Sequence, residues 1–94
     1  METAELERRI AELLSQAGKA HHQAFIHTNG DDAEWPLWYA QYLQPKMQER
    51  LGKPLTVSDL VYWLVASDRA HAAEAPDSKW PAFYARFFLD HVMK

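Results

Sequence analysis

The sequence predicts an all-α fold, a four-helix bundle-like single domain built from two duplicated helix-loop-helix halves. Three observations predict it. Apolar residues recur at steps of three and four, turn-forming residues gather between those segments, and a Trp-Pro dipeptide followed by aromatic residues occurs twice. We expect residues 1–94 to form one helical domain around one core, with half-repeats at about 5–52 and 56–94.

The first predicted helix extends from Glu5 to about Thr28. Its apolar residues share the spacing of one helical face and are Leu6, Ile10, Leu13, Leu14, Ala17, Ala20, Ala24 and Phe25. Asn29 and Gly30 follow, and both residue types suit the left-handed conformation that ends many helices. We therefore expect a turn at these two residues.

The second predicted helix begins near Pro36, because the missing N–H of a proline costs nothing in the first turn of a helix. Pro45 lies farther along the same segment, where it removes a backbone donor and its ring clashes with the preceding turn. We expect a kink there or a break into two short helices. Gly52 and Pro54 end the segment.

The third and fourth helices have equally clear start signals. Thr56 is a suitable N-cap, and Asp59 falls in the first turn, near the positive end of the helix dipole. We expect the third helix to reach roughly to Glu74. After a loop that contains Pro76, the dipeptide Trp80-Pro81 opens the fourth helix.

An internal repeat underlies this organisation. Residues 34–43, EWPLWYAQYL, align without a gap on residues 79–88, KWPAFYARFF, so that Trp-Pro and Tyr-Ala coincide. Upstream, residues 19–21, Lys-Ala-His, correspond to residues 69–71, Arg-Ala-His. Each half therefore consists of a helix, a loop, Trp-Pro and a second helix. We expect the halves to pack face to face about an approximate two-fold axis.

One stretch also resembles a known group of proteins. Residues 21–43, HHQAFIHTNGDDAEWPLWYAQYL, resemble a family of small uncharacterised bacterial all-helical proteins in which a His-His pair precedes a Glu-Trp-Pro-x-Trp-Tyr-Ala segment. The resemblance covers about a quarter of the chain. It implies a helical fold and a bacterial origin, but it transfers no activity and no site residue.

Composition excludes several classes of function. The net charge is −3 and the ten Lys and Arg residues are scattered, so we expect no nucleic-acid partner. The chain has no cysteine, which rules out disulfides and thiolate metal sites. The charged start of the sequence and the lack of any apolar run of about 18 residues predict a cytoplasmic protein that does not contact a membrane.

The candidate site lies between the two halves. His21 and His71 occupy equivalent positions, and Asp68 falls three residues before His71 on one helical face. These three residues are the candidate ligands for a divalent metal such as Zn, Fe, Ni or Mn, although no other cofactor is expected. Trp35 and Trp80 complete the candidates for binding a small ligand. Alternatively, each histidine caps its helix or donates to the following loop.

The aromatic residues of the second and fourth helices form the candidate interface. Trp38 and Tyr42 on one helix, and Phe83 and Phe87 on the other, exceed what a single small core needs. Exposed aromatic surface often marks a partner or dimer interface. Alternatively, the kink at Pro45 and the first helix cover these rings.

These observations favour a protein–protein interaction or dimerisation module that contacts a protein partner or a second copy of the chain. The alternative is a metal or small-ligand binding protein with a His/Asp site between the halves. Enzymatic activity is the least favoured class, and no catalytic residue is assigned. A histidine base would need a nucleophile, for which Ser67 and Ser78 are the nearby candidates.

Overall fold

The computed structural model describes residues 3–52 and 54–92, except for the side chain of Leu51. The helices in order are α1 (Thr3–Ala24), the 3₁₀ helix η1 (Ile26–Thr28), α2 (Trp35–Leu51), α3 (Val57–Glu74) and α4 (Trp80–His91). The described residues contain no strand, which confirms the all-α prediction. None of the helices in this described part combines the length and the apolar character that a bilayer crossing requires.

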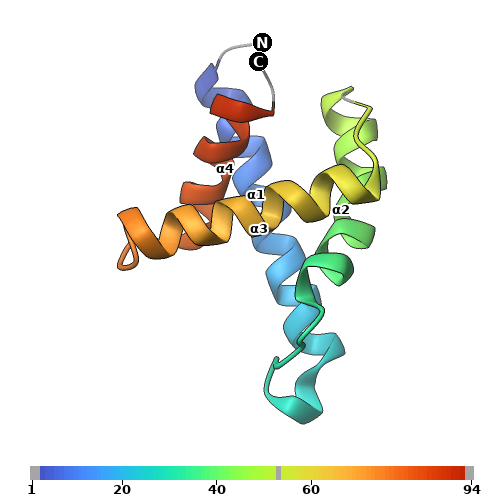
Figure 1. The fold of residues 1–94 in the computed structure, drawn as a ribbon. Helices are drawn as coiled ribbons and strands as arrows, with labels where there is room; N and C mark the ends of the chain where they lie inside the picture. Colours follow the sequence, from blue (N-terminus) through green and yellow to red (C-terminus); the bar gives the residue numbers. More distant parts are fainter. Residues whose placement is uncertain (1–2, 53, 93–94) are drawn as a thin grey trace.

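The helices pack as a four-helix bundle, with α1 on α4 and α2 on α3. Contacts of α1 with α2 and of α3 with α4 complete the ring. Figure 1 shows α1 and α4 side by side and α3 crossing from α2 to α4. Arg86 of α4 pairs with Glu7 of α1 across this contact, 3.2 Å from Nη1 to Oε1.

The core is formed by apolar faces of all four helices. The predicted stripe of α1 is buried at Ile10, Leu13, Leu14 and Ala17. The other helices contribute the buried residues Ala40, Leu43, Met47, Leu60, Leu64, Tyr84, Ala85 and Phe88. Because burial of apolar surface is the main driving force for folding, this shared core fixes how the helices are arranged.

Several helices begin or end at the capping residues from which their ends were predicted. Thr56 and Asp59 form a capping box in which Thr56 Oγ1 accepts from the Asp59 amide at 3.0 Å and Asp59 Oδ2 accepts from the Thr56 amide at 3.1 Å. Gly52 ends α2 in the left-handed region, at φ 67°. Pro36 and Pro81 lie in the first turns of α2 and α4.

The first helix ends earlier than the predicted limit near Thr28. α1 stops at Ala24, and η1 follows. Donors in the loop replace those of a continuing helix at the Phe25 carbonyl. This carbonyl accepts from the Gly30 amide at 2.8 Å and from Thr28 Oγ1 at 3.1 Å. Asn29 and Gly30 have φ values of 57° and 89°, so both adopt the predicted left-handed conformation.

We expected a kink or a break at Pro45, and the break does not occur, since α2 is one continuous helix. Proline removes the N–H that would bond to the Gln41 carbonyl, one turn earlier. Pro45 and Gln41 are both exposed, so water can solvate that carbonyl. Leu43 and Met47, on either side of Pro45, are buried in the same core and hold both parts of the helix in place.

Candidate functional site

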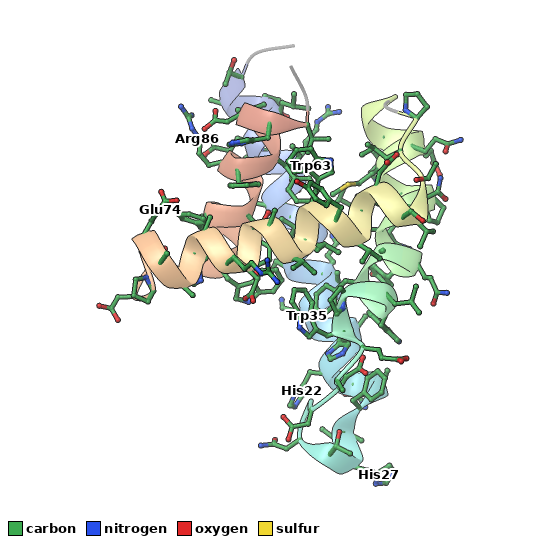
Figure 2. The ribbon with its side chains drawn as sticks, viewed as in Figure 1. His22, His27, Trp35, Trp63, Glu74 and Arg86 are labelled. Carbon is green, nitrogen blue, oxygen red and sulfur yellow. The ribbon has the colours of Figure 1, made fainter. Side chains whose placement is uncertain are left out.

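A pocket of about 480 Å³ lies between the two halves of the chain. The first half lines it with His21, Gly30, Asp31, Asp32, Trp35 and Tyr39, and the second half lines it with Asp68, His71, Trp80 and Tyr84. All five residues predicted to bind a ligand are therefore at one pocket. In Figure 2, Trp35 lies at the start of α2 below the crossing helix α3, whereas His27 lies at the far tip of the molecule.

His21 pairs with an acidic residue of the loop that follows α1. Its Nε2 lies 3.0 Å from Asp32 Oδ2, and the two side chains are only 8% and 12% exposed. Because an ionised carboxylate can only accept, we assign the proton of this hydrogen bond to His21 Nε2. Asp32 Oδ1 also accepts from the Glu34 amide at 3.1 Å. Asp32 thereby ties the end of α1 to the residue that precedes α2.

His71 makes the corresponding contact in the second half. Its Nε2 lies 2.8 Å from the Ser78 carbonyl oxygen, which can only accept, so Nε2 donates. The ring lies 5.2 Å from that of Phe83 and 6.1 Å from that of Tyr84, between ring centroids. Each histidine therefore contacts the loop that precedes a Trp-Pro dipeptide, as in the alternative in which the histidines donate to these loops.

Asp68 accepts a hydrogen bond inside the pocket. Tyr84 Oη donates to Asp68 Oδ1 at 3.0 Å. Burial raises the pKa of the Tyr84 phenol well above its ordinary value, and the hydrogen bond and negative charge of Asp68 raise it further. Burial also raises the pKa of Tyr39. Both phenols therefore remain protonated at neutral pH, and the Tyr84 hydroxyl remains a donor to Asp68.

Four aromatic rings form a continuous row along the pocket. Ring centroids are 5.8 Å apart from Trp35 to Tyr39, 6.0 Å from Tyr39 to Trp80 and 5.1 Å from Trp80 to Tyr84. Each ring is steeply inclined to the next, at 90°, 78° and 66° respectively. The first two rings come from α2 and the last two from α4, so the row joins the two halves.

The Trp80 ring lies close against α1, and the lack of a side chain at Gly18 makes room for it. A Cβ atom at this position would lie 2.9 Å from Trp80 Cζ2, closer than carbon atoms approach. Glycine is costly inside a helix, by about 1 kcal/mol relative to alanine. Its presence in α1 is therefore explained by the close approach of the Trp80 ring.

The predicted metal ligands do not form a coordination group. In residues 3–52 and 54–92, no three His, Cys, Asp or Glu side chains are placed to hold a metal ion together. His21, His71 and Asp68 line the same pocket, but each is bonded to a different partner, namely the Asp32 carboxylate, the Ser78 carbonyl and the Tyr84 hydroxyl.

The two serines considered as nucleophiles are bonded elsewhere. Ser67 is buried and its Oγ donates to the Trp63 carbonyl at 2.7 Å. Ser78 Oγ donates to the Ala75 carbonyl at 2.8 Å. Neither of these two hydroxyls donates to an imidazole, so neither serine is paired with a histidine base.

The four candidate interface residues are half-buried, and each contacts another ring of the chain. Trp38 stacks on Tyr42, with centroids 5.5 Å apart and planes inclined by 12°. Phe87 stacks on His91 at 4.2 Å, and Phe83 lies against His71. Part of the surface of these four rings is therefore covered by other residues of the same chain.

The pocket also contains residues that the sequence analysis did not single out. Tyr39 and Tyr84 line it, and each follows a pocket tryptophan by four residues, or one helical turn. They coincide in the alignment of the two halves, so the repeat contained a signal for them. Asp31 and Asp32, which lie in the loop between η1 and α2, also line the pocket.

Comparison with known proteins provides no relative for this site. No family model, curated protein or solved structure matches the chain. The pocket is therefore interpreted from the chemistry of its own residues.

Proposed function

We propose that this protein binds a small organic ligand in the pocket between its two halves. The observation that carries the proposal is that one pocket collects side chains from all four α-helices, including the paired residues His21 and His71 and the paired residues Trp35 and Trp80. Its volume of about 480 Å³ falls within the range of about 300–1,000 Å³ that is usual for ligand sites.

The chemistry of the lining supports the same function. Ligand pockets combine aromatic walls with a few polar groups that orient the bound molecule. Trp35 and Trp80 are among the largest apolar side chains of the protein, yet they are only half-buried. A ligand in the pocket would cover the ring surface that the protein leaves exposed.

The predicted duplication suggests how such a pocket arises. Exchanging α1 with α3 and α2 with α4 maps each of the four main packing pairs onto another pair of the same set. In the same exchange, His21 corresponds to His71 and Tyr39 to Tyr84. We propose that the halves are related by duplication, with the pocket at the approximate two-fold axis.

The interaction or dimerisation module remains a separate prediction with weaker support. The large apolar side chains exposed within the described residues are Ile26, Leu37 and Tyr62, which lie on three different elements. None of them belongs to the predicted interface. Because isolated apolar residues are normal on protein surfaces, they do not favour a partner over a ligand.

Native mass spectrometry of the untagged protein is the first test, because one spectrum reports both the number of subunits and any retained ligand mass. A small-molecule library should then be screened by following the indole N–H signals in ¹H–¹⁵N NMR spectra. We expect bound compounds to shift the signals of Trp35 and Trp80 and to leave that of Trp63, which does not line the pocket, unchanged.

Two matched variants locate the binding. Trp80→Phe should weaken any compound found in this way, whereas Trp63→Phe should not. A library without binders, or binders that respond equally to both variants, would contradict a ligand site at this pocket.

A further inference from the structure

The carboxylates that line the pocket are not matched by any Lys or Arg among the described residues of its lining. Its lining contains three acidic residues, Asp31, Asp32 and Asp68, and no Lys or Arg within the described residues. Lys19 lines an adjoining hollow that shares His21, Tyr39 and Trp80 with the pocket, and Lys19 is exposed. Since carboxylates are ionised at neutral pH, a partly enclosed pocket of this kind concentrates a negative potential.

Two of the three carboxylates are available to a ligand. Asp32 is already bonded through both oxygens, to His21 and to the Glu34 amide. Asp68 uses Oδ1 for the Tyr84 hydroxyl, and the described residues offer no hydrogen-bond partner to its Oδ2. The same holds for the carboxylate of Asp31 within that part of the chain. Asp31 lies on the loop and Asp68 on α3, so they border the pocket from opposite halves.

The aromatic row suits a positive charge. The face of an aromatic ring attracts a cation that lies within about 6 Å of its centroid, and Trp does so most strongly. Because the rings of Trp35, Tyr39 and Trp80 are steeply inclined to one another, a compact cation beside them can contact more than one ring. The protein already contains such a contact elsewhere, where Lys46 Nζ lies 4.1 Å from the centroid of Tyr42.

The start of α2 offers an anion little to bind. Helix N-termini attract anions through unpaired N–H groups, and α2 begins at this pocket. The Trp35 amide, however, donates to the Asp32 carbonyl, the Leu37 amide donates to the Glu34 carbonyl, and Pro36 has no N–H. The start of α2 is therefore already satisfied, and the nearby carboxylates would repel a negative ligand.

We propose that the ligand is an organic ammonium ion, held with its charged nitrogen against the faces of Trp35 and Trp80 and with Asp31 and Asp68 as counter-charges. This proposal rests on the proposed function, since it assigns a chemical class to the occupant of the same pocket. It assigns to Asp32 and His21 the role of holding the loop in place rather than binding the ligand directly.

The test compares cations with neutral molecules of nearly the same shape. The full chain is titrated with choline and with 3,3-dimethylbutan-1-ol, in which carbon replaces the quaternary nitrogen, and with butylammonium and butan-1-ol. Binding is followed by the indole signals of Trp35 and Trp80. We expect the cation of at least one pair to bind about 10-fold more tightly than its neutral counterpart.

The outcomes separate this proposal from the proposed function. Equal or tighter binding of the neutral molecules would overturn the assignment of a cation but leave a ligand pocket in place. If none of the four compounds binds while the library yields neutral or anionic binders at Trp35 and Trp80, the cation is again excluded. A library without any binder at the pocket contradicts the proposed function itself.

Charge-neutralising variants provide the second readout. Asp68→Asn keeps an acceptor for the Tyr84 hydroxyl, and Asp31→Asn changes an exposed loop residue, so both should fold. Each should weaken the binding cation about 5- to 10-fold and leave the neutral counterpart unchanged. Asp77→Asn, on the other loop and outside the pocket, is the matched control and should change neither. Equal losses for the cation and the neutral molecule would contradict a counter-ion role.

Discussion

His21 Nε2 and Asp32 Oδ2 lie 3.0 Å apart and join the last turn of α1 to the loop that leads into α2. Both side chains are nearly buried, and Asp32 also accepts from the Glu34 amide through Oδ1. The acidic residue thus satisfies two donors at once. Because the loop borders the pocket, this pair connects the stability of the helix junction to the geometry of the site.

Removing the Asp32 carboxylate should therefore destabilise the fold. Asp32→Ala leaves the His21 N–H and the Glu34 amide without their acceptor, and an unsatisfied buried donor costs about 1–3 kcal/mol. We expect a loss of this size in the free energy of unfolding, measured by urea denaturation. Asp32→Asn, which retains one acceptor oxygen, should cost less. Asp77→Ala, at an exposed loop position, is the control and should leave the free energy of unfolding unchanged. If Asp77→Ala and Asp32→Ala lowered the free energy of unfolding equally, the His21–Asp32 pair would have no specific role in stability.

Gly18→Ala tests the close approach of α1 to Trp80. Alanine raises helix propensity by about 1 kcal/mol, but its Cβ would lie 2.9 Å from Trp80 Cζ2 and force the ring to move. We expect a net loss of about 1 kcal/mol in the free energy of unfolding and a shifted Trp80 indole signal. In the background of Trp80→Phe, which has no Cζ2, the same substitution should stabilise the protein. The sign of Gly18→Ala must therefore reverse between the two backgrounds, and additive effects would argue against the contact.

Tyr84 predicts a loss of stability at alkaline pH. Burial, with the hydrogen bond and charge of Asp68, raises its pKa in the folded protein above the value of about 10 expected in the unfolded chain. A raised pKa contributes stability that is present below pH 10 and is lost as the pH rises toward the folded pKa. We expect the unfolding free energy of the wild type to fall more steeply above pH 10 than that of Tyr84→Phe. Tyr62→Phe, at a 65% exposed position, should keep the wild-type slope.

The start of α3 and the end of α2 could be predicted from the sequence because their causes are local. Thr56 and Asp59 cap each other within one turn, and Gly52 adopts the left-handed conformation that its lack of a side chain allows. The continuity of α2 through Pro45 could not be predicted in this way. It depends on the exposure of Pro45 and on core contacts on both sides of it, which only the packed protein defines.

In the candidate site, too, the sequence predicted which residues would be present but not how their side chains pair. The repeat singled out His21, His71 and the two Trp-Pro tryptophans, and all four line the pocket. The pairing of His21 with Asp32 could not be read from the sequence, because it requires the loop to return to the end of α1. Whether His21, His71 and Asp68 could bind one metal ion could not be read from the sequence either. Residues that line the same pocket need not have side chains that converge on one point.

Pro45→Ala should stabilise the protein, because the core rather than the sequence maintains α2 at this position. The substitution restores an N–H to the Gln41 carbonyl and removes a residue that costs about 3 kcal/mol inside a helix. Part of this gain is offset because alanine leaves the unfolded chain more flexible, so we expect an increase of about 1–2 kcal/mol in the unfolding free energy. Pro36→Ala is the matched control, since a proline in the first turn lacks no helical hydrogen bond, and it should give no such gain. A destabilised Pro45→Ala variant would mean that the proline shapes α2 in a way the core requires.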